Sequence, residues 1–286
     1  MRSTPLGASG ISKMPSDSLR VAAVQLSSQD NLEENLAICR EQIAAVASQG
    51  AKVVLLPENF AYMGPEPGKH TVAERLGDTS APIQRTLGDA ARAHRISIIA
   101  GGLAERSDDP RRPYNTCAVF AESGDVIASY RKIHLFDVDL ADGTTLRESA
   151  GSSAGNEPVA VSLGGFSVGL SICYDLRFPE LYRALVDRGA ELLVVPAAFT
   201  LHTGKDHWHV LLRARAIESQ CFVLAAAQWG KHPQGRTTYG HSLVVDPWGT
   251  IIAEASDRIG AVVSDVSRED LRRVRASVPC LQHRRL

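Results

Sequence analysis

Short runs of Val, Ile and Leu alternate with amphipathic helical patterns along the whole chain, and this alternation limits the folds open to it. Residues 52–57 (KVVLLP) and 191–198 (ELLVVPAA) are apolar at nearly every position, as strands buried on both faces are. Between such runs, apolar residues recur at spacings of four and three, as in Leu32, Leu36 and Cys39, which is typical of a helix with one buried face. The alternation predicts an α/β fold.

Some apolar runs follow one another with only a turn between them. One pair is separated by Ser123-Gly124-Asp125 and another by Gly164-Gly165, which are residues typical of hairpin turns. The runs that these turns join are 116–122, 126–132, 158–163 and 166–172. Hairpins mixed with strand–helix alternation predict two sheets flanked by helices rather than a fully parallel barrel.

Helix ends are marked by Pro and Gly, because Pro favours the first helical turn and Gly the position after the last. We therefore expect helices to begin at Pro82 and Pro179 and to end before Gly50 and Gly189. A further helix is expected from about Asp206 to Ser219.

No change of composition or long linker divides the chain. Residues 19–286 are therefore predicted to form one domain, whose last helix begins with a capping box made by Ser267 and Asp270. Residues 1–18 are small, polar and rich in Gly and Pro, and we expect them to be a disordered lead-in.

Charge limits the class of partner. The chain has 31 basic and 32 acidic residues, a formal net charge of -1, so neither nucleic acid nor an anionic membrane is an expected partner. A small-molecule substrate fits better. Residues 1–18 lack the apolar core of a secretory signal, so we expect a cytoplasmic protein, with organelle targeting by this segment as the alternative.

Five widely scattered cysteines, without a C-x-x-C pair, predict neither a disulfide framework nor a structural zinc site. Cys39, Cys117 and Cys221 are interpreted as core residues. Cys173 differs, because the sequence around it reads as strand, sharp turn and helix, which exposes a nucleophile. A helix start and a nearby ammonium would favour its thiolate. The alternative for Cys173 is also a buried core cysteine.

Glu58, Lys132 and Cys173 each lie just past an apolar strand, and the carboxyl ends of strands form the rim where α/β folds bind ligands. Partial burial would raise the pKa of Glu58 toward neutrality, which suits a general base. A fixed ammonium at Lys132 would stabilise negative charge on a carbonyl oxygen. The alternatives are a solvated loop glutamate and an exposed lysine.

Histidines offer a competing chemistry. His202, His207 and His209 lie close together in the sequence with Asp206 beside them, but their spacing matches no known zinc motif. We therefore predict no metal site, and metal-assisted hydrolysis through these residues remains the alternative. A serine hydrolase is not supported, because no G-x-S-x-G occurs.

Three segments together resemble a known family. LLPENF, YRKIHLFDVD and SICYDLRFPELYR are similar, in order and context, to the Glu, Lys and Cys motifs of the nitrilase (carbon–nitrogen hydrolase) superfamily. The resemblance covers nearly everything from Arg20 onward. CYDLRFPE is similar to the branch that contains deaminated glutathione amidase and ω-amidase, and TYGHSLVVDPWG looks more like the former. Where relatives often have an acid after the HW pair, this chain has His209.

The resemblance implies a role for four residues. Glu58 is expected to be the general base, Lys132 the oxyanion partner and Cys173 the nucleophile, while Glu148 matches a second glutamate that positions the site. Without the resemblance, Glu148 would be interpreted as an ordinary loop carboxylate. No cofactor or metal is expected.

The resemblance also implies a substrate-binding wall. The backbone of Tyr174 is expected to help to hold the oxyanion, and Arg177 to bind a substrate carboxylate or, alternatively, to pair with a neighbouring acid. Phe199 and Thr200 match a pocket-lining stretch, although a Phe is more often a core residue.

Fold and activity follow from the same resemblance. It implies an α-β-β-α four-layer sandwich that assembles as a homodimer or a larger homo-oligomer. The expected activity is hydrolysis of a small carboxylate-bearing amide through a cysteine thioester, with deaminated glutathione as the favoured substrate. The alternatives are ω-amidase action on 2-oxoglutaramate, an N-carbamoyl amino acid amidohydrolase, and a catalytically idle binding protein on the same fold.

Overall fold

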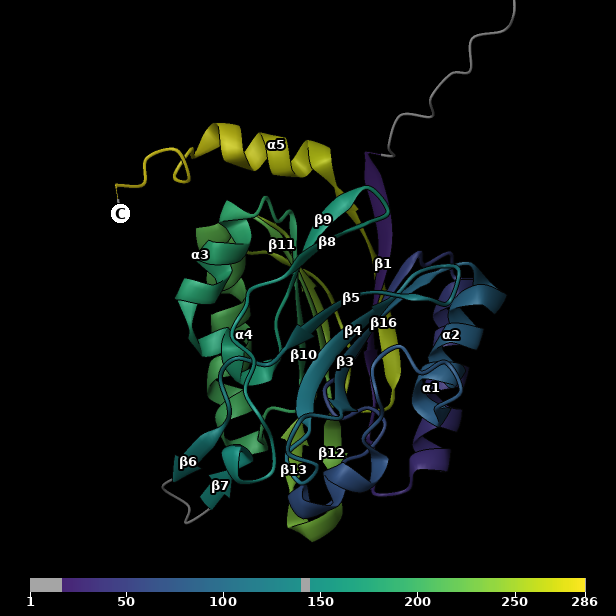
Figure 1. The fold of residues 1–286 in the computed structure, drawn as a ribbon. Coiled ribbons are helices and arrows are strands. Elements are labelled where there is room, and N and C mark those ends of the chain that lie inside the picture. Colours follow the sequence, from purple (N-terminus) through teal and green to yellow (C-terminus); the bar gives the residue numbers. More distant parts are fainter. Residues whose placement is uncertain (1–16, 140–144, 286) are drawn as a thin grey trace, which may run out of the picture.

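The structure is a computed structural model that describes residues 17–139 and 145–285. Two six-stranded sheets pack face to face and helices cover the outer face of each, which confirms the predicted four-layer sandwich (Figure 1). Most of the expected disordered lead-in, residues 1–16, lies outside the described residues, and the first strand already begins at Ser18.

The first sheet has the strand order β16-β1-β2-β3-β4-β5. Strands β1, β2 and β3 are parallel, and the other neighbours are antiparallel. The bounds are Ser18–Gln25 for β1, Val53–Leu56 for β2, Ser97–Glu105 for β3, Tyr114–Phe120 for β4, Val126–Arg131 for β5 and Gly260–Ser267 for β16. Strands β4 and β5 form the hairpin predicted around Gly124.

The second sheet has the order β15-β14-β11-β10-β9-β8, with β9, β10 and β11 parallel. Its bounds are Ala160–Leu163 for β8, Phe166–Leu170 for β9, Leu192–Ala197 for β10, Phe222–Ala227 for β11, Leu243–Val245 for β14 and Ile251–Glu254 for β15. Strands β8 and β9 pair as the predicted hairpin across Gly164-Gly165.

Helices form the two outer layers. Helices α1 and α2 pack on the first sheet, and α3 and α4 on the second (Figure 1). The bounds are Leu32–Ser48 for α1, Pro82–His94 for α2, Pro179–Asp187 for α3, Leu201–Ser219 for α4 and Arg268–Ser277 for α5. Gly50 (φ 87°) and Gly189 (φ 83°) follow helix ends in the left-handed conformation, as predicted.

One helix start and one half of a predicted capping box differ from the prediction. Helix α4 begins five residues earlier than expected, at Leu201, because the Thr200 hydroxyl caps it by accepting a hydrogen bond from the Thr203 amide (3.4 Å). Ser267 caps α5 through the Glu269 amide (3.1 Å). Asp270, the expected second half of that capping box, instead forms an ion pair with an arginine one turn later.

Strand β2 shows why its sequence is apolar throughout. Val53 and Leu55 point into the core between the sheets, whereas Val54 and Leu56 pack against the helices of the first outer layer. All four are fully buried, and burying such a side chain stabilises the fold by about 1.5–3 kcal/mol. A strand sandwiched in this way positions the residues that follow it rigidly.

Apart from the sharp turn at Cys173, the short elements were not predicted. In residues 17–139 and 145–285, two hairpins with strands of three residues each and four 3-10 turns connect the main elements, and they are too short and polar to produce a hydrophobic period. They are β6 (Asp137–Asp139) with β7 (Thr145–Arg147), β12 (Trp229–Lys231) with β13 (Thr237–Tyr239), and turns η1 (Glu66–Val72), η2 (Glu148–Ala150), η3 (Cys173–Arg177) and η4 (Pro233–Gly235).

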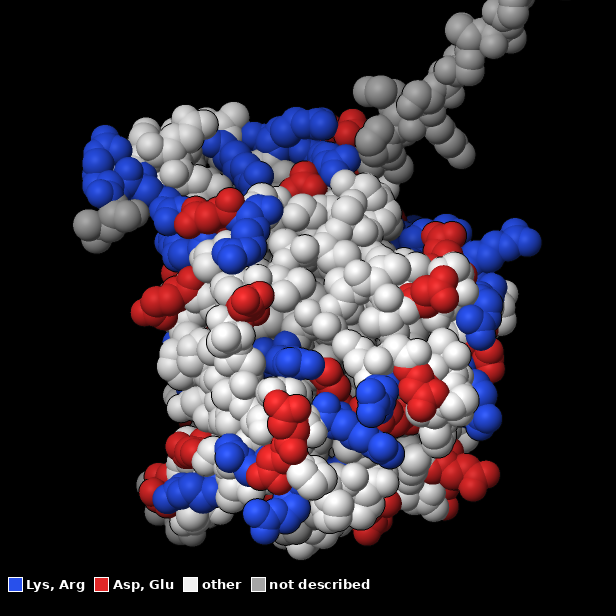
Figure 2. Space-filling model, in the orientation of Figure 1, with Lys and Arg blue, Asp and Glu red and all other residues white. Residues whose placement is uncertain are grey.

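Charge is mixed on the face seen in Figure 2, where basic and acidic side chains alternate, with basic ones gathered near α5. In the described part of the chain, no helix combines the length and hydropathy that crossing a bilayer requires.

Candidate active site

The ends of several strands meet at one cavity of about 530 Å³. Glu58 follows β2, Lys132 follows β5 and Cys173 follows β9, as the sequence predicted. All eight residues expected at the site line the cavity: Glu58, Lys132, Glu148, Cys173, Tyr174, Arg177, Phe199 and Thr200.

Lys132 lines the cavity, with its side chain only 1% exposed. Its ammonium contacts Glu58 Oε1 at 2.9 Å and Glu148 Oε2 at 2.8 Å. Asn115, which the sequence did not identify, donates from Nδ2 to both carboxylates at 2.9 and 3.1 Å. The two glutamates and the lysine therefore form one buried, hydrogen-bonded cluster.

Glu58 is held at both carboxylate oxygens, because the Ala198 amide donates to Oε2 at 3.1 Å. Room for its side chain comes from an irregularity in β3, where Gly102 is in the left-handed conformation (φ 81°). A Cβ at Gly102 would lie 3.0 Å from Glu58 Cγ and 2.9 Å from the Asn59 amide nitrogen. Glycine at position 102 therefore allows Glu58 and the Asn59 backbone to pack closely against β3.

The pKa of Glu58 shifts in the direction opposite to the predicted one. Burial alone raises it, but the adjacent Lys132 ammonium outweighs burial and brings the pKa below its usual value. The prediction that burial raises this pKa toward neutrality is therefore wrong. Lys132 likewise lowers the pKa of Glu148 to about 2 against the effect of burial, and the two carboxylates raise the pKa of Lys132.

Lys69 is a further cation that sequence reasoning missed. It lies in η1, is buried and pairs with Glu66 at 2.8 Å, and it contributes to the low pKa of both Glu58 and Glu148. No strand end or periodic pattern marks this lysine, so the sequence offered no signal for it.

Cys173 occupies the sharp turn that the sequence predicted, but the residue is buried (7% exposed) rather than exposed. It is the first residue of η3 and has a left-handed backbone (φ 49°), which is uncommon for a residue other than glycine. Asp175 holds the turn by accepting from the Ile172 amide at 2.9 Å. The same carboxylate accepts from the Tyr130 hydroxyl at 2.6 Å and the His134 amide at 3.1 Å, and so ties the turn to the end of β5.

The thiol of Cys173 is buried, and burial together with the Glu58 carboxylate raises its pKa well above the usual value. The Lys132 ammonium lowers this pKa but does not compensate. The expectation that the surroundings favour a resting thiolate is therefore wrong, and the thiol needs a base. Cys39, Cys117 and Cys221 are fully buried and line no part of this cavity, in agreement with their interpretation as core residues.

Aromatic and cationic side chains form the cavity wall. The Arg177 guanidinium lies 5.2 Å from the Phe199 ring centre and 5.9 Å from that of Tyr174, and contacts His207 Nδ1 at 3.3 Å. Among residues 17–139 and 145–285, Arg177 forms no ion pair with a carboxylate, in contrast to the alternative considered for it. Arg236, not identified from the sequence, also lines the wall.

His202, His207 and His209, which are close in the sequence, do not point to a common site. His202 is exposed, His207 faces Arg177, and His209 contacts His241 and Glu254 away from the cavity. The metal-assisted alternative through these three residues and Asp206 is therefore not supported by their arrangement.

Residues 20–276 match the carbon–nitrogen hydrolase family. The chain belongs to this family. It is 45% identical over 266 residues to the deaminated glutathione amidase of Synechocystis, which covers 92% of this chain and 97% of the relative. The crystal structure of NitFhit from Caenorhabditis elegans superposes with a TM-score of 0.89 at 38% identity, covering 95% of this chain and 66% of that one.

A second solved structure gives the same assignment. Nit3 of Saccharomyces cerevisiae, described as a member of branch 10 of the nitrilase superfamily, has a TM-score of 0.84 and 31% identity, with 96% and 99% of the two chains covered. The family resemblance found in the sequence is thus confirmed.

Proposed function

We propose that this protein is a cysteine amidase that hydrolyses a small carboxylate-bearing amide. The observation that carries the proposal is the shared cavity of a thiol, two carboxylates and an ammonium, at Cys173, Glu58, Glu148 and Lys132. These are the groups that acyl transfer to sulfur requires: a nucleophile, a base and a positive charge for the oxyanion.

The first step forms a carbon–sulfur bond. Glu58 is ionised at neutral pH because its pKa is low, and the Cys173 thiol is protonated because its pKa is high. Glu58 therefore takes the thiol proton as sulfur attacks the amide carbon, and the carbonyl electron pair moves to oxygen. The Lys132 ammonium and the backbone N–H of Tyr174 hold this oxyanion.

Two steps follow, and Glu58 transfers a proton in each of them. Glu58 gives its proton to the departing nitrogen, the carbon–nitrogen bond breaks, and a thioester remains on Cys173. Glu58 then takes a proton from water as the water oxygen attacks the thioester carbon. The carbon–sulfur bond breaks, the carboxylic acid leaves, and the proton on Glu58 returns to the Cys173 sulfur. Glu148 positions Lys132 through both carboxylate oxygens (3.1 and 2.8 Å) in every step, and no cofactor takes part.

Deaminated glutathione is the proposed substrate. Support comes from the name of the Synechocystis relative and from the cations on the cavity wall, which suit an anionic amide that ends in a 2-oxo acid. Arg177 is the proposed carboxylate anchor, since its guanidinium can offer two parallel hydrogen bonds. The runner-up is ω-amidase action on 2-oxoglutaramate, a shorter molecule with the same carboxylate requirement.

Kinetics on matched substrates test the proposal. Purified protein is assayed with deaminated glutathione, 2-oxoglutaramate, an N-carbamoyl amino acid and a simple nitrile. We expect the highest kcat/KM for deaminated glutathione. A higher value for 2-oxoglutaramate would favour the runner-up, and a higher value for the carbamoyl compound would favour an N-carbamoyl amino acid amidohydrolase. Preference for the nitrile, which has no carboxylate, would contradict the assignment of Arg177 as well.

Mass spectrometry of the quenched reaction tests the covalent step. We expect a thioester adduct on the Cys173 peptide with a slow substrate, and none in Cys173→Ala, which should lose turnover by several orders of magnitude while remaining folded. Full activity in Cys173→Ala would overturn the mechanism.

We also propose that the protein is a homodimer that buries α3 and the C-terminal tail. Exposed apolar side chains support this, because Ile217, Trp248 and Val278 line one hollow beside the tail and are 49%, 58% and 47% exposed. Light scattering should give twice the chain mass of 30.8 kDa. A clean monomer would contradict it.

A further inference from the structure

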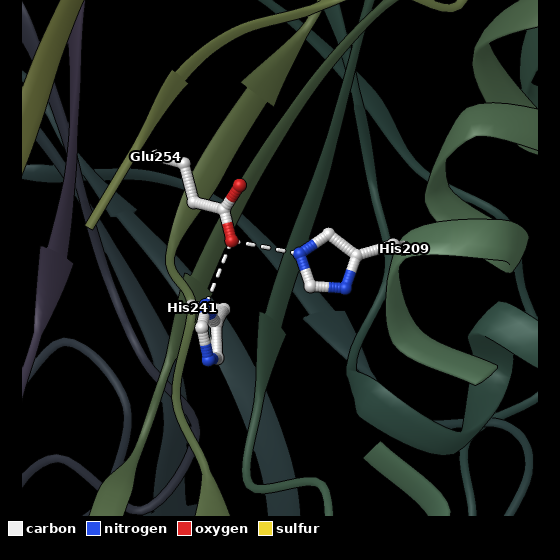
Figure 3. A group of neighbouring side chains, drawn as sticks. All are labelled: His209, His241 and Glu254. Carbon is white, nitrogen blue, oxygen red and sulfur yellow. Dashed lines mark hydrogen bonds and ion pairs between the residues drawn. The ribbon is translucent and has the colours of Figure 1, made fainter. Parts of the chain in front are cut away.

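A second polar cluster lies where α4 passes the edge strand of the second sheet. His209 comes from α4, His241 from the loop before β14 and Glu254 from β15 (Figure 3). One carboxylate oxygen, Glu254 Oε1, lies 2.8 Å from His209 Nε2 and 2.7 Å from His241 Nδ1. Two imidazole nitrogens and a carboxylate from three separate elements therefore converge on one point.

Neighbouring groups fix the two rings. Tyr239 stacks on His241 with ring centres 4.4 Å apart and meets the edge of His209 at 5.8 Å. Trp208 donates from Nε1 to the backbone carbonyl of His241 at 2.8 Å, and His241 has a left-handed backbone (φ 60°). A left-handed histidine held by a buried Trp is a strained arrangement, and such strain gathers at functional sites.

We propose that His209, His241 and Glu254 form a binding site for a divalent transition-metal ion, with Zn²⁺ as the reference ion. The donor atoms all lie within 4.8 Å of one another. Zinc bonds to histidine nitrogen and carboxylate oxygen are about 2.0–2.2 Å long, which sets tetrahedral donors about 3.3 Å apart. The two contacts to Glu254 would lengthen by about half an ångström, as the metal replaces the two shared protons.

The groups around His209, His241 and Glu254 resemble those around metal-binding side chains. The far nitrogen of His241, Nε2, lies 3.4 Å from Asp257, and metal-bound histidines commonly donate that second nitrogen to a carboxylate. The side chains of His209, His241 and Glu254 are 27%, 25% and 33% exposed, so an ion and a water as its fourth ligand can enter from solvent.

The proposed ion has a structural role. None of its three ligands lines the cavity that holds Cys173, so the ion would not touch the reacting atoms. It would instead fasten α4 to β15, which has a neighbouring strand on one side only. An ion that binds the folded chain and not the unfolded one raises thermal stability in proportion to its affinity.

Calorimetric titration with Zn²⁺ tests the site, in Cys173→Ala protein so that the catalytic thiol cannot bind the ion. We expect one equivalent to bind and the Tm to rise by several degrees. Adding either His209→Ala or Glu254→Gln should weaken binding at least tenfold and abolish the Tm rise. The matched control is His202→Ala, an exposed histidine on the same helix, which should bind as the parent does.

Co²⁺ absorption gives a second readout, because cobalt bound to nitrogen and oxygen shows ligand-field bands without a thiolate charge-transfer band. Loss of these bands in Glu254→Gln, whose fold circular dichroism checks, would support the site even where His209→Ala fails to fold. Absence of stoichiometric binding at micromolar Zn²⁺ would overturn the proposal. Unchanged affinity in the folded Glu254→Gln protein would overturn it too, since the ion would then bind elsewhere.

Discussion

The cluster around Lys132 and the cluster around Glu254 have inverse compositions, because the first joins one basic side chain to two carboxylates and the second joins one carboxylate to two basic side chains. In the first, one ammonium is held between two carboxylates, and the three side chains are 1%, 4% and 8% exposed. In the second, one carboxylate is held between two imidazoles, and the three side chains are 25–33% exposed. Similar contact distances of 2.7–2.9 Å therefore occur in very different surroundings.

Burial decides what each cluster can do. Removing one partner of a buried ion pair leaves an uncompensated charge and is strongly destabilising, whereas an exposed pair contributes little. Before substrate arrives, the interior cluster therefore keeps Glu58 ionised and Lys132 positively charged, which suits a base and an oxyanion partner. The surface cluster can exchange its shared protons with solvent, which suits reversible binding of an ion.

The largest expected effect is that of Lys132→Met, which breaks the interior cluster. Glu58 and Glu148 would remain buried without their shared cation, so the free energy of unfolding should fall by about 3–5 kcal/mol. Loss of the oxyanion partner should reduce kcat by a factor of about 10²–10³. Urea unfolding and steady-state kinetics measure both. Lys52→Met, an exposed lysine before β2, is the control, and a loss of stability equal to that of the control would refute the contrast.

The second largest expected effect is that low pH reduces the stability contribution of the interior cluster more than that of the surface cluster. The low folded pKa of Glu148, about 2 against 4.5, gives stability that is present above pH 4.5 and is lost as pH falls toward 2. Between pH 7 and pH 3 this loss is about 2 kcal/mol. Glu148→Gln should remove that part of the pH dependence, whereas Glu254→Gln, at an exposed site, should hardly change it. Urea unfolding of both variants at pH 7 and pH 3 measures this difference. An equal change of unfolding free energy with pH in the two variants would contradict the prediction.

Arg177→Lys tests whether a cation on the cavity wall binds the carboxylate of the substrate. Replacing two parallel hydrogen bonds with a single ammonium should raise KM about tenfold and change kcat less, if ground and transition states bind alike. Arg147 also lines the cavity, but Asp139 already holds its guanidinium with two contacts of 2.8 Å. Arg147→Lys is therefore the matched control, and an equal rise of KM in both variants would remove the special role of Arg177.

The smallest expected effect is that of Glu254→Gln in metal-free protein at neutral pH. Exposed charge pairs contribute about 0–1 kcal/mol, so the free energy of unfolding should change by less than 1 kcal/mol and amidase activity should stay the same. A loss comparable with that of Lys132→Met would show that exposure does not distinguish the clusters.

Sequence reasoning succeeded where the signal is local. A run such as VVLL fixes β2, and the residue just past it, Glu58, then has to lie at the sheet edge beside Lys132 and Cys173. It failed where partners are distant in the chain. Asn115 joins Glu58 from another strand, and His209 meets Glu254 across 45 residues.

The pKa directions failed for the same reason. Burial of Glu58 could be expected from its position after an apolar strand, but its opposing charge comes from Lys132, 74 residues away. The sign of the shift depends on the balance of both effects, and only the folded arrangement of the two groups determines it.

The pairing of β1 has a consequence for how the chain is made. One edge of β1 pairs with β2 soon after synthesis begins, but its other edge pairs along all eight residues with β16, more than 200 residues later. At ribosomal rates of about 5–20 residues per second, that edge waits roughly 10–50 s for its partner. An unpaired strand edge is a template for joining other chains. The nascent protein therefore presents an open strand edge to other chains until β16 has emerged.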